Sequence, residues 1–368
     1  MNFNFTEEQQ AIAELADQII GDHSDPAALR EIELGSGPRF DAGLWSALAE
    51  AGLLGIAAPE SAGGAGLGLV EAALVIRASA LHAAAAPVWE TLGLGIPVLS
   101  RYVDNEVAAG WLAKAASGEA IVTAAWHEEL GEPLDPQLVT ATADGPAWSL
   151  SGTKVLVPAG LIANAVIVPA RTESGPALFL VDLSDLGDAE RVEVRTTAAT
   201  PDANLHFANT AATLLATGDE AIAWAYDRAV ATQCAAALGT AESALRITAD
   251  YTKERKQFDV PIATFQAVGH RAADSYIDVE SIRLTTMQAL WLLAADRDAT
   301  IEVSAAQYWA AQSGQRVSLA AAHLHGGVGG DRDYPLHRYF IFEKQYELHL
   351  GGASAALRRL GREIAASA

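Results

Sequence analysis

The 368-residue sequence has one cysteine, two methionines and no apolar run of about 20 residues. The single cysteine, Cys234, excludes an internal disulfide, and its position among alanines favours an inert core side chain over a nucleophile. Because neither a signal peptide nor a membrane-spanning run is evident, we expect a soluble, cytoplasmic protein.

Basic residues are also scarce. Lys and Arg number 24 against 46 Asp and Glu, which gives a formal charge of −22 at pH 7. This balance argues against nucleic acid and against anionic membrane surfaces as partners. Aromatic residues make up only 7% of the chain, whereas alanine is abundant, which suits closely packed helices. The length leaves room for two or three domains with cores of their own.

Hydrophobic periodicity divides the chain into three parts. Residues 1–119 and 216–368 carry runs of helical period, whereas residues 120–215 hold short β-rich runs separated by turn residues. In the middle part Asp144-Gly145 is a turn dipeptide between two β-rich runs, which predicts a hairpin. We therefore predict a mostly α fold with a central β domain, a small antiparallel barrel or sandwich, between two helical domains.

Two proline-free runs in the last part, residues 221–251 and 265–295, predict a pair of antiparallel helices with the break between them at Pro261. The turn carries Arg255 and Phe258, a planar fork of donors and a flat ring that suit an anionic, planar partner. On spacing alone, an ordinary solvated basic corner is the simpler interpretation.

The run from Arg255 to Gln266 contains R-x-Q-F, then Pro-Ile, then F-Q, and it resembles the helical hairpin of the acyl-CoA dehydrogenase family. The resemblance implies that family's fold: an N-terminal helical domain, a small antiparallel β-barrel and a C-terminal four-helix bundle. In the family, this hairpin reaches the FAD of a neighbouring subunit. Carried over by position, the cofactor-binding residues are Arg255, Phe258 and Gln266.

A second stretch near the end of a predicted helix resembles the family's Gly-Gly loop. Gly326 and Gly327 fall where the family backbone approaches the ribose and pyrophosphate of FAD, which requires residues without side chains. His323 stands where the family usually has Gln, and it can still donate one hydrogen bond. The resemblance therefore implies an FAD shared at a subunit interface.

The family's catalytic base is absent from its expected positions. In the family, a Glu in an apolar pocket removes the α-proton of an acyl-CoA thioester while the β-hydrogen leaves as hydride to the flavin. Counting from Tyr334-Pro335, that position falls on Leu350, and the family's alternative position falls on Ala229-Val230. The nearby Asp227 is out of register by two residues, about 200° around a helix. No catalytic residue is therefore assigned at either position.

Other carboxylates lie close to the expected position in the sequence. Glu347, three residues before Leu350, could share a helical face with it and is the alternative base. The favoured expectation is that Glu343, Lys344 and Glu347 form a solvated face of charged side chains.

The flavin's own position in the β domain is altered as well. The family's Thr-Glu-Pro-Gly loop corresponds to residues 123–131, which read TAAWHEELG, and its Trp-x-Thr corresponds to residues 155–158, VLVP. The aromatic platform and the hydroxyl are both replaced by residues that cannot supply them. A flavin held in this chain's own cleft is therefore not expected.

Together these features predict the non-catalytic subunit of a heteromeric acyl-CoA dehydrogenase. The chain is similar to the subunit without the Glu in α2β2 enzymes of actinobacterial steroid side-chain β-oxidation. The resemblance implies a Glu-bearing partner subunit, a bulky acyl-CoA substrate, an electron acceptor and one FAD per unlike pair. Two alternatives stay open: a self-sufficient homotetrameric dehydrogenase or related flavin enzyme using Glu347, and a flavin-free structural homologue.

Overall fold

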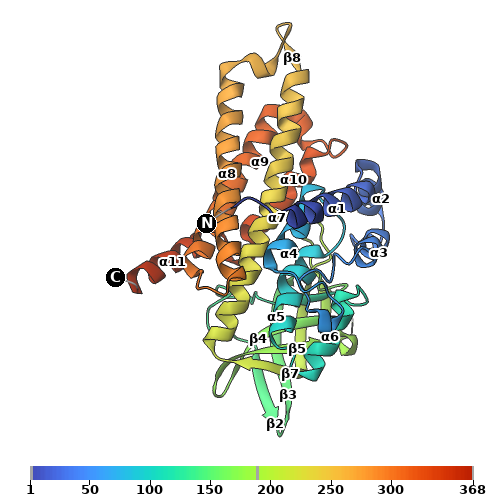
Figure 1. The fold of residues 1–368 in the computed structure, drawn as a ribbon, viewed down its shortest axis with the longest axis vertical. Coiled ribbons are helices and arrows are strands. Elements are labelled where there is room, and N and C mark those ends of the chain that lie inside the picture. The colour runs from blue at the N-terminus through green and yellow to red at the C-terminus, as the bar shows by residue number, and fades with distance from the viewer. Residues whose placement is uncertain (1–2, 188–189, 367–368) are drawn as a thin grey trace.

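The computed structural model describes residues 3–187 and 190–366, and it has the predicted class of fold (Figure 1). Helices at the N-terminus lie beside a long helical bundle, and a β-barrel lies at the lower end of the view. The N-terminal elements are α1 (Glu7–His23), α2 (Pro26–Leu34), α3 (Ala42–Glu50), η1 (Glu60–Ala62), α4 (Leu69–Leu81), the π-helix η2 (Glu90–Gly95), α5 (Ile96–Arg101) and α6 (Glu106–Ala116). Four of the α-helices begin at side chains whose oxygens accept backbone amides: Thr6, Asp25, Asp41 and Asn105.

The middle part of the chain forms a seven-stranded mixed sheet with the order β1-β4-β2-β3-β7-β5, and β6 pairs with β7. Because β4 also pairs with β5, five strands close into a barrel, which removes their free edges. The predicted hairpin at Asp144-Gly145 is confirmed, with Ala143 opposite Trp148. The strands are β1 (Val122–Ala124), β2 (Thr140–Asp144), β3 (Ala147–Val157), β4 (Ala165–Thr172), β5 (Gly175–Asp182), β6 (Arg191–Glu193) and β7 (Ala203–Thr217), with η3 (Leu183–Asp185) after β5.

The C-terminal part is a bundle of long helices. The predicted pair is confirmed as α7 (Asp219–Glu254) and α8 (Gln266–Ala294), which pack against α9 (Thr300–His325). The remaining elements are η4 (Ile262–Thr264), η5 (Gly326–Gly330), α10 (Leu336–Leu348), η6 (His349–Gly351) and α11 (Gly352–Ala366). None of the helices in the described ranges is both long and apolar enough to cross a membrane. The domain boundaries at 119/120 and 215/216 stay predictions.

The segment between α7 and α8, residues 255–265, is called the arm. It contains a two-stranded hairpin, β8 (Lys256–Gln257) and β9 (Val260–Pro261), at the top of Figure 1. Phe258 and Asp259 form its turn with φ angles of 53° and 63°, the left-handed geometry of a tight hairpin loop. The arm thus holds Phe258 at its tip.

Helix α7 lies at the centre of the molecule and packs against α4, α8, α9 and α10. Its crossing with α4 is close: a Cβ on Gly239 would lie 2.3 Å from the carbonyl oxygen of Arg77. Cys234 on the same helix is 2% exposed, which confirms its place in the core.

Candidate functional site

The position expected for the catalytic Glu lies in the turn between α10 and α11. Leu350 is 1% exposed and has a left-handed backbone with φ of 55°. Its carbonyl oxygen accepts hydrogen bonds from Tyr226 Oη at 2.5 Å and Gln307 Nε2 at 2.6 Å. Its amide donates to His127 Nε2 at 3.2 Å. Backbone contacts from three elements therefore fix this turn, and its buried side chain has no group that accepts a proton.

The alternative position, Ala229-Val230, is buried in α7. The nearby Asp227 forms an ion pair with Arg359 of α11 at 2.6 Å and accepts a hydrogen bond from the Thr300 hydroxyl. Burial raises the pKa of Asp227, and Arg359 opposes this rise. Asp227 thus attaches α11 to α7.

The predicted solvated face on α10 is wrong for Glu343. Its side chain is 1% exposed, and neither carboxylate oxygen has a hydrogen-bond partner among the described residues. Burial raises the pKa of Glu343 well above its ordinary value of 4.5. Space for the carboxyl comes from Gly314 on α9, which sequence periodicity in α10 does not show. Glu347 forms an ion pair with Lys344 and accepts a hydrogen bond from Gln315 at 3.3 Å.

Aromatic and imidazole rings fill the space between the barrel and the α10–α11 turn. Trp126, just after β1, packs edge-on against Tyr226 with ring centroids 5.4 Å apart. His349 lies between His127, at 6.2 Å, and Trp89, at 5.8 Å. Burial lowers the pKa of His127 to about 4 and that of His349 to about 3, so both rings are neutral at pH 7. Residues from the altered 123–131 loop therefore pack against the bundle directly.

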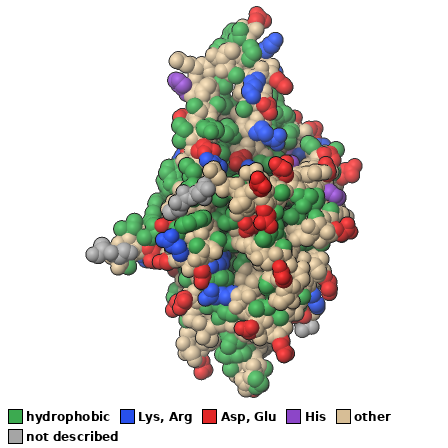
Figure 2. All heavy atoms as spheres, in the orientation of Figure 1, with side chains coloured by type: hydrophobic (Ala, Val, Ile, Leu, Met, Phe, Trp, Pro, Cys, Tyr) green, Lys and Arg blue, Asp and Glu red, His purple; other side chains and the backbone are tan. Residues whose placement is uncertain are grey.

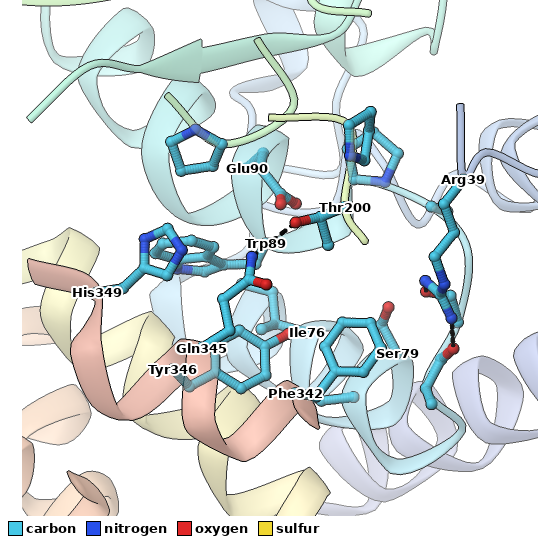
Figure 3. A pocket seen from close by; sticks show the side chains of 17 residues that line it. Arg39, Ile76, Ser79, Trp89, Glu90, Thr200, Phe342, Gln345, Tyr346 and His349 are labelled. Carbon is cyan, nitrogen blue, oxygen red and sulfur yellow. Dashed lines mark hydrogen bonds between the residues drawn. The ribbon is translucent and has the colours of Figure 1, made fainter. Parts of the chain in front are cut away.

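The cavity that remains here has a volume of about 40 Å³ (Figure 3). A cavity of this size holds a few water molecules, whereas sites for larger organic ligands are typically about 300–1,000 Å³. Side chains from all three parts of the chain line it: Arg39, Trp89, Glu90, Thr200, Phe342, Gln345, Tyr346 and His349. An isoalloxazine or an acyl chain does not fit in this space.

Arg39 closes one side of the cavity. Its guanidinium donates to the carbonyl oxygens of Ala84, at 2.9 Å, and Ala83, at 2.5 Å, and lies 4.8 Å from the Phe342 ring centroid. Burial lowers the pKa of Arg39 to about 10, so it stays charged at pH 7. Another arginine, Arg338 of α10, forms an ion pair with Glu33 of α2 and holds the N-terminal helices against the bundle.

Two buried carboxyl groups, one lining the cavity and one bonded to its lining residue Gln345, have raised pKa values. The π-helix η2 places Glu90 at the cavity wall, where burial raises its pKa to about 8. The neighbouring charge of Asp202 adds to this rise, and Arg39 opposes it. Burial also raises the pKa of Asp202 to about 7, although its oxygens accept hydrogen bonds from the Ala159 amide and Gln345.

We expect Glu90→Gln to raise stability at pH 8 and to flatten its dependence on pH. The folded-state pKa of Glu90 lies above the ordinary value of 4.5, so the folded protein binds this proton more tightly than the unfolded chain. The free energy of unfolding therefore falls as pH rises from about 4.5 through about 8. Each pKa unit corresponds to about 1.4 kcal/mol.

Thermal melts of wild type and Glu90→Gln across this pH range measure the difference. A residual slope from Asp202, whose pKa is shifted in the same direction, is expected in both proteins. Parallel curves for the two proteins would show that Glu90 does not titrate as described.

A buried ion pair connects strand β3 of the barrel to the altered segment of residues 123–131. Lys154 on β3 is 0% exposed, and its ammonium lies 2.9 Å from Glu128 Oε1 and 2.5 Å from Gln137 Oε1. Glu128 also accepts the amides of Leu138 and Val139. This network attaches the loop of residues 128–139 to the barrel.

The six predicted cofactor-binding residues are all at the other end of the bundle, far along α7 from the cavity. Each is exposed: Arg255, Phe258, Gln266, His323, Gly326 and Gly327. Phe258 is 89% exposed and meets only Phe265 edge-on, with centroids 6.2 Å apart. Tyr251, one helical turn before the arm, stacks on His325 with ring centroids 4.2 Å apart. The arm and the glycine corner, residues 326–330, therefore lie at the same end of the bundle.

Sequence reasoning missed the residues that support this corner. His325 Nδ1 donates to the Ala321 carbonyl oxygen at 2.8 Å, and its Nε2 lies 3.3 Å from Tyr334 Oη. Tyr251 Oη donates to the His325 carbonyl oxygen at 3.4 Å. The only available signal was a tyrosine one helical turn before Arg255. The cluster joins residues that are up to 83 positions apart, as the numbers of Tyr251 and Tyr334 give, so spacing alone could not reveal it.

The end of the bundle that carries the arm also differs from the rest of the chain in its balance of basic and acidic residues. Residues 246–275 contain five Lys and Arg against four Asp and Glu, which leaves 19 against 42 elsewhere. In Figure 2 the end of the bundle at the top of the view carries several Lys and Arg side chains next to acidic ones. An anionic ligand therefore meets much less repulsion at this end than over the remaining surface.

Comparison with known proteins identifies the family. The model for the acyl-CoA dehydrogenase N-terminal domain matches residues 6–119, and that for the C-terminal domain matches residues 208–364. The chain is 41% identical over 374 residues to acyl-CoA dehydrogenase FadE27 of Mycobacterium tuberculosis, covering 99% of each chain. The protein belongs to the acyl-CoA dehydrogenase family, oxidoreductases that act on CH–CH bonds.

Two solved structures are similar over nearly the whole chain. One is the ChsE4–ChsE5 complex of Mycobacterium tuberculosis, with a TM-score of 0.93, 41% identity and 99% of each chain covered. The other is a variant of the steroid acyl-CoA dehydrogenase Tcur3481–Tcur3483, with a TM-score of 0.92, 40% identity and 98% of each chain covered. The predicted family resemblance is thereby confirmed, and members of this family bind FAD.

Proposed function

We propose that this chain is the non-catalytic subunit of a heteromeric, FAD-dependent acyl-CoA dehydrogenase. The observation that carries the proposal is the small volume of the chain's own cavity, about 40 Å³ and lined by His349, together with the buried Leu350 in the turn beside it. A chain whose own cavity cannot accommodate the flavin and the thioester can contribute to catalysis only when it is paired with a chain that accommodates both.

The arm supplies the groups for a flavin bound mainly by the partner. Arg255 has the planar fork that pairs with a pyrophosphate, and Phe258 presents an exposed ring at the tip. Apart from its chain neighbours, no atom of the described residues lies within 4 Å of a Cβ on Gly327, so packing among these residues does not explain that glycine. Close approach of a ligand or partner backbone does explain it.

The reaction is α,β-desaturation of an acyl-CoA thioester. FAD supplies the hydride acceptor when bound, and the Glu of the partner subunit removes the α-proton. In this chain Arg255, Gln266 and His323 bind and orient the nucleotide end of the cofactor, and Gly326 and Gly327 let the backbone approach it. The similarity to a named steroid dehydrogenase supports a bulky, steroid-type acyl group.

The contacts of Glu347 support the alternative, a self-sufficient homotetramer that uses Glu347 as its base, less well than they support the proposed function. Its carboxylate is paired with Lys344, and it lies three residues from a turn whose backbone is held by Tyr226 and Gln307. Expression of the chain alone, and together with a Glu-bearing acyl-CoA dehydrogenase subunit, separates the alternatives by flavin absorbance and turnover. We expect a colourless lone chain and a yellow, active complex. FAD on the lone chain, with turnover that Glu347→Gln abolishes, would refute the proposal.

We expect Arg255→Ala to weaken FAD retention in the complex by about tenfold or more, because a charge-assisted hydrogen bond contributes about 1.5–3 kcal/mol. Lys253→Ala is the matched control, since Lys253 is a neighbouring exposed cation that pairs with Asp250. FAD release during dilution or dialysis, followed by fluorescence, measures the effect. Equal retention in both variants and wild type would contradict the assignment of Arg255.

A further inference from the structure

His325, the last residue of α9, lies between the glycine corner and the arm. Its side chain is buried, and the corner begins at the next residue, Gly326, with φ of 61° and ψ of −138°, a backbone geometry that favours glycine. A Cβ on Gly329 would lie 3.2 Å from the His325 Cβ and 3.0 Å from the Ala322 carbonyl oxygen, so the corner folds back tightly onto the end of α9. The direction in which the corner leaves the helix is therefore set at His325.

Both ring nitrogens of His325 are engaged, and the contacts fix one tautomer. The Ala321 carbonyl oxygen can only accept, so Nδ1 carries the proton. In this tautomer Nε2 accepts the hydroxyl of Tyr334. Burial lowers the pKa of His325 below its ordinary value of 6.5, so the ring is neutral at pH 7 and keeps this pattern. Because Tyr334 comes after the corner, the ring closes the loop of residues 326–333 across its base.

Tyr251 continues the connection from His325 to the arm. Its ring stacks on His325, and its hydroxyl donates to the His325 carbonyl oxygen. The carbonyl oxygen of Tyr251 in turn accepts the amide of Arg255 at 2.8 Å. The carbonyl oxygen of Arg255 accepts the amide of Ile262, also at 2.8 Å, so both backbone polar groups of Arg255 are held. An unbroken series of contacts therefore runs from the corner through His325 and Tyr251 to Arg255.

We propose that His325 is a positioning residue that holds the glycine corner and Arg255 at one fixed separation, the separation that a dinucleotide bound by the partner requires. This inference rests on the proposed function, in which the corner and the arm contact the same cofactor. Two elements that must meet one ligand bind it more tightly when their separation is fixed beforehand, because less conformational freedom is lost on binding. With its side chain buried, His325 acts through the backbone of these elements and not by touching the cofactor.

The test measures the dissociation constant of the co-expressed complex for FAD, by titrating the dialysed complex and following flavin fluorescence. His325→Phe keeps a flat ring against Tyr251 and removes both ring hydrogen bonds, so we expect it to weaken FAD binding by about three- to tenfold. Tyr334→Phe removes only the hydroxyl and is the milder second variant, with an expected loss of about threefold. His325→Gln keeps an acceptor near the position of Nε2 and should recover part of the affinity.

His206→Phe is the matched control. His206 is a half-buried residue of β7, in the barrel, and its Nδ1 lies 2.9 Å from the Thr153 hydroxyl. The substitution therefore removes a comparable contact at the other end of the molecule, and it should leave FAD binding unchanged. Circular dichroism and thermal melts confirm that each variant folds.

A double-mutant cycle with Arg255→Ala separates positioning from simple packing. If His325 acts by placing Arg255, His325→Phe should weaken FAD binding by about twofold or less in the Arg255→Ala background, because the contact that it supports is already gone. Equal losses in both backgrounds would show that the ring only packs the end of α9, which overturns the inference.

The remaining outcomes separate this inference from the proposed function. Unchanged FAD affinity in His325→Phe and Tyr334→Phe, with affinity lost in Arg255→Ala, would overturn the positioning role and leave the proposed function standing. Unchanged affinity in Arg255→Ala as well would contradict the proposed function itself.

Discussion

Glu128→Gln is expected to destabilise the protein by about 3–5 kcal/mol, the usual cost of removing one member of a buried ion pair. Lys154 is fully buried, and Glu128 is its only carboxylate partner within the described ion pairs. Burial lowers the pKa of Lys154 to about 8, and Glu128 opposes this decrease. Without Glu128, the ammonium is either buried uncompensated or must lose its proton, and the amides of Leu138 and Val139 lose their charged acceptor.

Denaturant unfolding at pH 7 measures this change, with Asp250→Asn as the control. Asp250 forms an ion pair with Lys253 in which both side chains are more than 60% exposed, and its loss should change stability by no more than about 0.5 kcal/mol. A loss below about 1 kcal/mol for Glu128→Gln would show that the loop of residues 128–139 is not anchored by this pair. The position of the pair is notable because Glu128 lies within residues 123–131, the segment that corresponds to the family's flavin-binding loop.

The second large effect concerns the crossing of α4 and α7. Gly239→Ala is expected to cost about 2–3 kcal/mol, because the new methyl group would lie 2.3 Å from the Arg77 carbonyl oxygen and 2.9 Å from the Leu81 amide nitrogen. Both neighbours are backbone atoms of one helix, so relief requires the two helices to separate. The gain in helix propensity from glycine to alanine, about 0.5–1 kcal/mol, offsets only part of this cost.

Gly110→Ala on α6 provides the opposite result in the same experiment. Outside its own helix, no atom of the described residues lies within 4 Å of the new Cβ, and the position is exposed, so the substitution should stabilise the protein by about 0.5–1 kcal/mol. Equal effects of Gly239→Ala and Gly110→Ala on the free energy of unfolding would mean that the α4–α7 crossing can relax. The difference between the variants therefore measures the rigidity of the central helix pair.

Local signals predicted the elements that depend on local chemistry. Asp144-Gly145 gave the β2–β3 hairpin, and proline-free helical periodicity gave α7 and α8. The arm's own hairpin was missed because Phe258 and Asp259 adopt left-handed geometry without the glycine that normally signals it. The 15-residue strand β7 was missed because its alanine-rich sequence has weak β propensity.

The candidate site depended on contacts that no local pattern contains. Glu343 was expected in solvent, and its burial is explained by Gly314 on another helix. Closure of the cleft joins Arg39, Glu90 and Phe342, which lie in different parts of the chain. The resemblance placed Leu350 at the expected position of the base, but it could not show that the surrounding space was filled.

The most direct test of this account is the ratio of FAD to polypeptide in the purified complex. Quantitative amino-acid analysis combined with the absorbance of released FAD gives this ratio. One flavin for each pair of unlike chains is predicted, because the proposed function gives this chain no flavin of its own and assigns its arm to the partner's site. One flavin for every polypeptide would contradict the account, since this chain would then hold a cofactor of its own.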